Sequence, residues 1–412
     1  MALPLPLRLL NAGGQLLRAG GFAVLELEGG ALCRQATRNT GGLEDFGDPA
    51  FRTPLGRLID SLENEADLTP LGRMIAKRDI VRLLENRLYM TAELKRRPEI
   101  SEAGIERPLF IIGLPRTGTS ILHELFAQDP ANRVPMTWEA LWPWPPPESA
   151  TFESDPRIGR AEKQLAGVDR VVPGFKAMHR MGARLPQECV ALTAHDFASM
   201  IFHTSYNAPS YQQWLDGADL VPVYASHKRQ LQYLQSRHAA ERWVLKSPGH
   251  LWALEALLAA YPDARIVQTH RDPLKVVASL SSLVTLLRGM VSQGSDRLAV
   301  ASDWSPRLAQ GLRYSMEARD RLGLGPEQIM DLQFKEFLKD EIAAVASIYD
   351  HFGMEFSAHA EARMRKFLAD HPHDKHGKHS YRLSDSGLDE KEERARYADY
   401  QERFSVASEA VN

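Results

Sequence analysis

The chain has 412 residues, of which 44% are hydrophobic and 25% are charged, and this is the composition of a globular protein with a sizeable core. Lysine and arginine number 50 against 53 acidic residues, so the formal net charge is −3, which argues against a protein that coats nucleic acid. Two cysteines, Cys33 and Cys189, cannot build a disulfide framework and fit a reducing compartment. No apolar run approaches the roughly 20 residues that span a bilayer. We therefore expect a cytoplasmic protein without a transmembrane segment.

Residues 1–107 are predicted to form a mainly helical N-terminal extension. Apolar residues recur at spacings of three and four in 55–62 and 75–94, which is the pattern of amphipathic helices. We expect a break at Thr69-Pro70, because proline is favoured at the first position of a new helix. Such an extension either caps a functional site or simply packs on the main domain.

From Pro108 onward the pattern changes to alternating strands and helices. Four short apolar runs, at 109–112, 243–245, 265–268 and 329–332, are typical of strands buried in a parallel sheet. Helical patterns follow them at 120–128, 251–261, 274–287 and 341–352. This alternation predicts an α/β domain over 108–385, with a P-loop-like parallel sheet flanked by helices. Residues 134–242 are then a helical and loop insertion that lines a pocket, and residues 386–412 are a helical tail.

The segment Gly113-Leu-Pro-Arg-Thr-Gly-Thr-Ser120 lies between the first predicted strand and its helix. In that position, backbone N–H groups and the helix N-terminus form a cradle for an anion. The spacing is that of a nucleotide-binding P-loop, but Thr119 stands where the lysine of such a loop is expected. Arg116 supplies a guanidinium that can bind a terminal phosphate in a bidentate manner. The alternative is a plain strand–turn–helix connection in which the glycines serve only the turn.

This loop resembles the 5′-phosphosulfate-binding loop of the sulfotransferases that use 3′-phosphoadenosine 5′-phosphosulfate (PAPS). A second segment, 268–279, resembles the 3′-phosphate-binding motif of that family, in which an arginine and a serine eight residues apart hold the phosphate. The resemblance covers about 108–385 and is greatest with bacterial-type members that have a helical N-terminal extension. The cofactor-binding residues that it implies in these two segments are Pro115, Arg116, Thr117, Gly118, Thr119, Ser120, Arg271 and Ser279. Without the resemblance, Arg271 could simply pair with Asp272.

A third motif, Trp243-Val-Leu-Lys-Ser-Pro-Gly-His250, ends another predicted strand. Lys246 resembles the active-site lysine of the family, and an ammonium group there can stabilise charge on the transferring group and on the departing phosphate oxygen. Cytosolic small-molecule members have a catalytic histidine two residues after this lysine, where this chain has Pro248. His250 is displaced from that position by two residues. The alternative is a surface lysine that merely ends a strand.

The acceptor hydroxyl requires a general base, because an alkoxide-like oxygen attacks better than a neutral hydroxyl. Glu139 is the first candidate, since it follows the first strand–loop–helix unit at the distance where family members that act on proteins and glycans place a glutamate. Glu188 and His179 compete for this role, and His250 is a further candidate. Glu139 and Lys246 are therefore the expected catalytic residues.

The segment from His371 to His379 combines four histidines with two lysines. Zinc is disfavoured there, because the spacing has neither cysteine partners nor a helical pair of histidines backed by a carboxylate. Lys375, Gly377 and Lys378 resemble the basic glycine loop that closes over the 3′-phosphate in the family, although the usual residue order is not kept. The alternative is a solvated basic loop. No metal is expected in the reaction.

The expected function is metal-independent transfer of the sulfuryl group from PAPS to a hydroxyl, which releases adenosine 3′,5′-bisphosphate (PAP). Aromatic and thioether side chains in the insertion favour a hydrophobic or aromatic small-molecule or lipid acceptor. The residues expected to bind it are Trp138, Trp142, His179 and Glu188. A P-loop kinase or NTPase and a catalytically silent nucleotide-binding member remain as alternatives. A homodimer and peripheral membrane contact stay open, and no nucleic-acid partner is expected.

Overall fold

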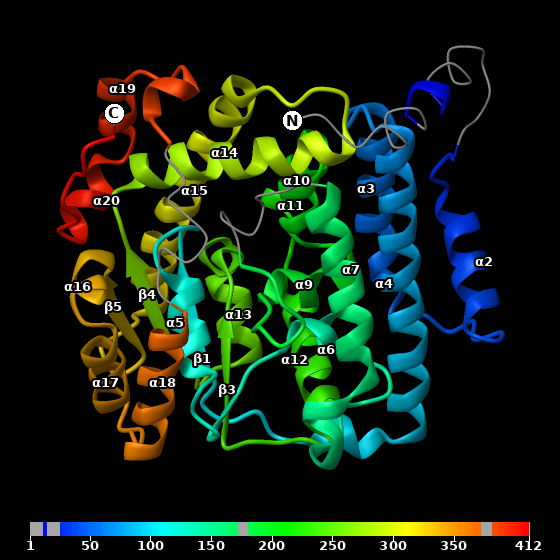
Figure 1. The fold of residues 1–412 in the computed structure, drawn as a ribbon, viewed down its shortest axis with the longest axis horizontal. Coiled ribbons are helices and arrows are strands. Elements are labelled where there is room, and N and C mark those ends of the chain that lie inside the picture. Colours follow the sequence, from blue (N-terminus) through cyan, green and yellow to red (C-terminus); the bar gives the residue numbers. More distant parts are fainter. Residues whose placement is uncertain (1–10, 15–24, 172–179, 372–380, 412) are drawn as a thin grey trace.

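The computed structural model describes residues 11–14, 25–171, 180–371 and 381–411. Its centre is a parallel sheet with the strand order β2-β3-β1-β4-β5 (Figure 1). The strands are β1 (Leu109–Gly113), β2 (Asn132–Arg133), β3 (Arg242–Lys246), β4 (Arg265–His270) and β5 (Ile329–Gln333). The four longer strands lie where the sequence predicts them, and the parallel α/β fold is confirmed.

Both faces of this sheet are covered by helices. Leu109 and Ile111 of β1 point into one apolar cluster, whereas Phe110 and Ile112 contribute to the cluster on the opposite face. Because alternate side chains of a strand point to opposite faces, a strand covered on both sides reads as a continuous apolar run. The first cluster includes α5 (Thr119–Phe126), α17 (Glu341–His351) and α18 (Ala358–Asp370), and the second includes α12 (Val221–Gln235), α13 (Leu254–Ala260), α14 (Pro273–Val291) and α15 (Arg297–Leu322).

The N-terminal extension is helical in the described residues, and its helices are α2 (Gly29–Asn39), α3 (Arg52–Asn64) and α4 (Pro70–Arg96). The predicted break between α3 and α4 is present. Thr69 caps α4 by accepting a hydrogen bond of 3.0 Å from the backbone N–H of Gly72, and Pro70 occupies the first helical position. The hydroxyl of the cap therefore satisfies a backbone donor that the first turn leaves without a partner.

The segment between β2 and β3 consists mainly of short helices in the described residues. They are α6 (Thr137–Leu141), α7 (Pro156–Val171), α9 (Cys189–Thr193), α10 (Ile201–Ser205), α11 (Pro209–Asp216) and the longer α12. One apolar cluster joins this insertion to the N-terminal extension. It contains Leu58 and Leu84 from the extension together with Phe197 and Tyr211 from the insertion. The two helical parts thus share a core (Figure 1).

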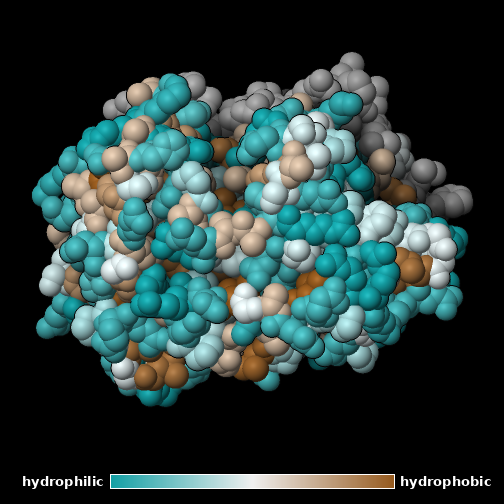
Figure 2. Space-filling model, turned by 90° about the horizontal axis from the view of Figure 1, so that it is seen from below, coloured by the Kyte–Doolittle hydropathy of each residue, from teal (hydrophilic) through white to brown (hydrophobic). Residues whose placement is uncertain are grey.

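The C-terminal part contains α16 (Phe334–Lys339), α19 (Glu390–Arg396) and α20 (Ala398–Arg403), and the last two lie beside α14 and the end of β4 (Figure 1). Among the described residues, α14 is the one helix with the length and apolar composition of a membrane span, and 56% of its most apolar window is buried. Figure 2 shows a mainly hydrophilic face with apolar residues in small, separate groups.

Candidate active site

The loop between β1 and α5 has a backbone that requires glycine at two positions. Gly113 has φ +140°, and a Cβ there would lie 2.7 Å from the carbonyl oxygen of Thr269 on the neighbouring strand β4. Gly118 has φ +85°, and a Cβ there would lie 3.0 Å from the ring of Phe334. Thr117 ties the loop down by donating a hydrogen bond of 2.6 Å to the carbonyl of Leu114. The loop is thus held close to the sheet, with the first turn of α5 directly behind it.

Arg116 brings the two predicted phosphate-binding segments together. Its φ of +69° places a non-glycine residue in the left-handed region, a strained conformation that is common at ligand sites. Its Nε donates a hydrogen bond of 3.1 Å to Oγ of Ser279, which is 4% exposed on α14. Burial lowers the pKa of Arg116, and the positive charge of Arg271 acts in the same direction. A dianion placed here would relieve that repulsion.

Arg271 lies at the carboxyl end of β4, beside the loop. One of its terminal nitrogens donates to the carbonyl of Arg116 at 2.9 Å, and its guanidinium lies 4.3 Å from the centre of the Phe334 ring. The other edge of the guanidinium contacts Glu409 from the C-terminal segment. Asp272 does not pair with Arg271 in the way that the alternative reading suggested: it caps α14 at Leu274 and binds Arg394.

Lys246 ends β3 and is 2% exposed, so it is not the surface lysine of the alternative reading. In the sheet, Lys246 is aligned with Ile111 of β1, the strand that leads into the loop before α5. Its Nζ donates a hydrogen bond of 3.2 Å to Oγ of Ser120 and forms an ion pair with Glu188. Ser120 is the last residue of the loop, so the anion cradle and the lysine–glutamate pair are in direct contact.

Glu188 is therefore the glutamate that the structure brings to Lys246. It occupies the position before α9, and its side chain is 21% exposed. His123, on the α5 side of Lys246, is buried with its Nε2 at 3.1 Å from the carbonyl of Val244. Burial lowers the pKa of His123 to about 3, and the charge of Lys246 adds to this effect. A neutral imidazole thus packs beside the charged pair.

Glu139 does not lie in this site, which corrects its expected role as the base. Its side chain is completely buried, and both carboxylate oxygens bind the guanidinium of Arg133, one of them at 2.7 Å. One of these oxygens also accepts a hydrogen bond of 2.8 Å from the backbone N–H of Met136, at the start of α6. A carboxylate with both oxygens held by a buried guanidinium and a helix N-terminus is a structural group, because it has no route to a substrate proton.

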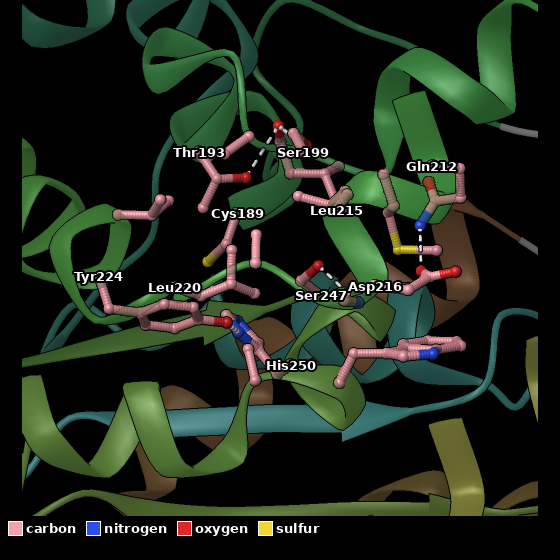
Figure 3. Close-up of a pocket in the computed structure, with 18 of the residues that line it drawn as sticks. Cys189, Thr193, Ser199, Gln212, Leu215, Asp216, Leu220, Tyr224, Ser247 and His250 are labelled. Atoms are coloured by element: carbon pink, nitrogen blue, oxygen red, sulfur yellow. Dashed lines mark hydrogen bonds between the residues drawn. The ribbon is translucent and has the colours of Figure 1, made fainter. Parts of the chain in front are cut away.

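A largely apolar pocket is lined by residues of α9, α11, α12 and the turn that follows β3 (Figure 3). Cys189, which follows Glu188, and Ser247, which follows Lys246, both line it. Figure 3 shows Tyr224 and His250 on one side of the pocket and Gln212 with Asp216 on the other. Its other apolar walls come from residues that the motifs did not single out, among them Leu215, Leu220, Val223, Ala253 and Trp304. Burial raises the pKa of the Cys189 thiol to about 12, so this wall carries no thiolate.

His250 lines this pocket at the short helical turn Pro248–Trp252, which precedes α13. The helix predicted for 251–261 thus begins later, at Leu254. The Nδ1 atom of His250 lies 2.5 Å from the hydroxyl of Tyr224, and the ring meets Phe110 edge-on at 5.1 Å between centres. Burial holds the pKa of His250 well below its usual value. The ring is therefore a neutral part of the pocket floor.

The predicted acceptor-binding tryptophans lie away from this pocket. Trp138 is 1% exposed and lines a second, more polar cavity together with Glu124 and Arg184, while the guanidinium of Arg157 lies 4.7 Å from its ring centre. Trp142 is also buried, and Arg160 covers its ring. Both indoles pack within the apolar cluster of α6 and α7.

Four predicted site residues, His179, Lys375, Gly377 and Lys378, lie outside the described residues. The described part of the chain contains no group of three or more histidine, cysteine, aspartate or glutamate side chains arranged to hold a metal ion. Among the residues that the structure describes, Arg116, Arg271 and Lys246 are cations that this site offers to an anionic ligand.

The fold and these motifs define the class of protein. The family model described as the sulfotransferase family matches residues 108–358, from the start of β1 to the first residue of α18. This match covers more than half of the chain and contains the loop, the lysine–glutamate pair and Ser279. The chain belongs to the sulfotransferase family.

Several known proteins resemble the chain over most of its length. The crystal structure of sulfotransferase STF9 from Mycobacterium avium superposes with a TM-score of 0.85 at 30% identity, covering 93% of this chain and 98% of that one. STF1 from Mycobacterium tuberculosis H37Rv gives a TM-score of 0.81 at 33% identity, with 91% and 100% covered. Omega-hydroxy-beta-dihydromenaquinone-9 sulfotransferase Stf3 from Mycobacterium bovis is 27% identical over 281 residues, which are 64% of this chain and 67% of that protein.

Proposed function

We propose that the protein transfers a sulfuryl group from PAPS to the hydroxyl of a hydrophobic or aromatic small molecule or lipid. The observation that carries this proposal is the contact of Lys246 with both Ser120 and Glu188. It joins an anion-binding loop to an acid–base pair at one point of the sheet edge. Ligands of open parallel α/β sheets bind outside the carboxyl ends of the strands, where this contact lies.

The residues around the loop fit PAPS better than a nucleoside triphosphate. Thr119 replaces the lysine that would bind β- and γ-phosphates, so a triphosphate with Mg²⁺ would lack its main protein charge partner. Arg271 and Ser279, in contrast, place a second pair of anion-binding groups against Arg116 of the loop. Two separate anion sites suit a nucleotide that carries charge at both its 5′ and its 3′ positions. PAPS, when bound, supplies a sulfuryl group activated by its 5′-phosphate.

We assign the general base to Glu188 in place of Glu139. Glu188 takes the proton from the acceptor hydroxyl as the acceptor oxygen forms its new bond to sulfur. Lys246 stabilises the negative charge on the phosphate oxygen whose bond to sulfur breaks. In the resting arrangement Glu188 is paired with Lys246, and this contact holds the carboxylate beside the lysine at the end of β3.

The acceptor is proposed to occupy the pocket that Cys189 and Ser247 line. Each of these residues adjoins a proposed catalytic residue in the chain, which supports placing the acceptor hydroxyl at this end of the pocket. The apolar walls favour a hydrophobic body over a polyanionic one. Stf3, the mycobacterial relative, is named for a hydroxylated menaquinone derivative, and this supports the same class of acceptor.

Calorimetric titration with PAP tests the donor. We expect binding without a metal, and we expect Arg116→Ala to weaken it. Arg78→Ala, an exposed arginine on α4, is the matched control and should bind PAP like the unaltered protein. Titration with ATP and Mg²⁺ tests the competing hypothesis of a kinase or NTPase. Tight, Mg²⁺-dependent ATP binding without PAP binding would favour that class of enzyme. Incubation of the protein with labelled PAPS and a panel of long-chain alcohols, phenols and sugars then tests whether the sulfuryl group is transferred to an acceptor.

A further inference from the structure

The guanidinium of Arg271, which the family resemblance assigns to the 3′-phosphate, is already paired with a carboxylate. Nε of Arg271 donates to one carboxylate oxygen of Glu409 at 3.1 Å, and a terminal nitrogen donates to the other oxygen at 3.3 Å. This is the two-pronged geometry in which arginine also binds phosphate. Glu409 lies 138 positions after Arg271, in the segment that follows α20. Neither residue type nor spacing in the sequence points to this pairing.

The C-terminal segment is anchored so that Glu409 stays at this place. The backbone N–H of Glu409 donates a hydrogen bond of 2.6 Å to the carboxylate of Asp272, the residue that caps α14. Arg394 binds the same carboxylate at 2.8 Å and also donates to the carbonyl of Glu409 at 3.1 Å. The backbone position is thus fixed by groups other than Arg271. The side chain of Glu409, in contrast, is 18% exposed and contacts the guanidinium of Arg271 through both carboxylate oxygens.

We propose that Glu409 is a placeholder for the 3′-phosphate: it holds Arg271 in its binding orientation when no nucleotide is present and competes with the phosphate when one arrives. The inference rests on the proposed PAPS donor. A phosphate monoester carries up to two negative charges against one on the carboxylate, so the phosphate displaces the side chain. The displaced carboxylate then stays near the phosphate because its backbone is anchored, and the repulsion between them weakens nucleotide binding.

Competition between Glu409 and the 3′-phosphate would affect how fast the product PAP is released. PAP keeps the 3′-phosphate after transfer, so it would otherwise remain bound to Arg116, Arg271 and Ser279 as firmly as the donor. Product release limits turnover in many enzymes. A nearby carboxylate that returns to Arg271 shortens the residence of PAP. Glu409 acts through Arg271 and touches no reacting atom, so its role is that of a positioning residue.

The test compares two nucleotides in Glu409→Gln, which keeps the size of the side chain and removes its charge. We expect PAP to bind about 10-fold more tightly to this variant, the size of effect given by one charge-assisted contact. Adenosine 5′-monophosphate, which lacks the 3′-phosphate, should bind the variant and the unaltered protein equally. Stopped-flow release of PAP should slow by a similar factor, and raised salt should shrink the difference because it screens the repulsion.

Glu402→Gln is the matched control, because Glu402 lies in α20 on the same C-terminal segment with an exposed side chain. Glu402→Gln loses the same charge and should leave the affinities for PAP and for adenosine 5′-monophosphate unchanged. Equal or weaker PAP binding by Glu409→Gln would overturn the inference, as would a gain of the same size for adenosine 5′-monophosphate. If both proteins bound PAP equally, only this inference would fail. If neither bound PAP, the donor proposal would fail with it.

Discussion

Nε of Arg116 donates a hydrogen bond of 3.1 Å to Oγ of Ser279, although 163 positions separate the two residues. They meet because β1 and β4 are neighbours in the sheet, with Gly113 aligned with Thr269. The segments that follow two adjacent parallel strands emerge at the same edge of the sheet. Two motifs that are independent in the sequence thus become one anion-binding corner.

Arg116→Ala should weaken PAP binding by about 2–3 kcal/mol, because it removes a partly buried guanidinium from a phosphate. Ser279→Ala should cost about 1 kcal/mol, the contribution of one uncharged hydrogen bond. Calorimetric titration measures both affinities, and thermal unfolding checks that the variants remain folded. Unchanged PAP affinity in a folded Arg116→Ala variant would contradict the assignment of this corner to the nucleotide.

Glu188→Gln should lower the turnover number by about 10²–10⁴-fold, the range typical of a lost general base. Affinity for PAP should change little, since the proposed role of Glu188 is to act on the acceptor hydroxyl and its ion pair is with Lys246. Single-turnover transfer from labelled PAPS measures the chemical step. Glu241→Gln, which alters an exposed glutamate before β3, is the control and should keep full activity. A Glu188→Gln variant with normal turnover would remove Glu188 from the mechanism.

Glu139→Gln, by contrast, should mainly destabilise the fold. The change leaves the buried guanidinium of Arg133 without a charged partner, and breaking a buried pair in this way costs about 3–5 kcal/mol. Urea unfolding measures this loss. Glu148→Gln removes half of an exposed pair with Arg237 and should cost less than about 1 kcal/mol. A stable Glu139→Gln protein that has lost transfer would restore Glu139 as a catalytic candidate.

The sequence identified Glu139 and Glu188 as candidate bases but did not show which of them contacts Lys246. Local patterns located the strands, the loop, Lys246 and both glutamates, since buried strands and glycine turns have short-range signatures. Which glutamate meets Lys246 depends on contacts between distant segments. Arg133, which binds Glu139, lies on the two-residue edge strand β2, too short for a recognisable pattern.

Helix α15 is a second element that local patterns do not predict. It runs from Arg297 to Leu322 with Pro306 inside, a residue that ordinarily breaks a helix interior. The buried side chains of Trp304 and Leu308, on either side of the proline, belong to the core cluster on one face of the sheet. Tertiary packing therefore outweighs the local cost of the proline, and α15 supplies one wall of the proposed acceptor pocket.

Ala218→Phe should raise the KM for a hydrophobic acceptor at least about 10-fold, because the larger ring fills pocket space that the acceptor needs. The affinity for PAP should not change, since Ala218 lies among the pocket residues and not in the loop. Steady-state kinetics with the best alcohol from the panel, together with PAP titration, separates the two effects. An unchanged KM would place the acceptor elsewhere, with the second cavity beside Trp138 as the competing site.

Stability should fall as the pH drops below about 6.5, the ordinary pKa of histidine. Burial lowers the pKa of His123, His195 and His227 to about 3 in the folded protein. Between about pH 6.5 and 3, the unfolded chain therefore binds protons that the folded chain does not. The contribution of these residues is present above pH 6.5 and is lost as the pH falls.

Thermal midpoints measured from pH 8 to pH 4 test this dependence. His227→Gln should show a shallower decline over the same range, because one of the histidines whose pKa is lowered by burial is gone. His359→Gln, an exposed histidine in α18, should follow the unaltered protein. Parallel profiles for all three proteins would show that His227 does not contribute.

The apolar cluster shared by the N-terminal extension and the insertion determines where the chain can be cut into fragments that still fold. Leu58 and Leu84 lie outside the segment that matches the family, yet they pack with Phe197 and Tyr211 inside it. A fragment cut at Pro108 would expose half of that cluster to water and would loosen α11, which supplies Leu215 to the pocket. The boundaries of sequence similarity are therefore not those of an independently folding unit, and transplanting acceptor preference between relatives would require moving the N-terminal helices as well.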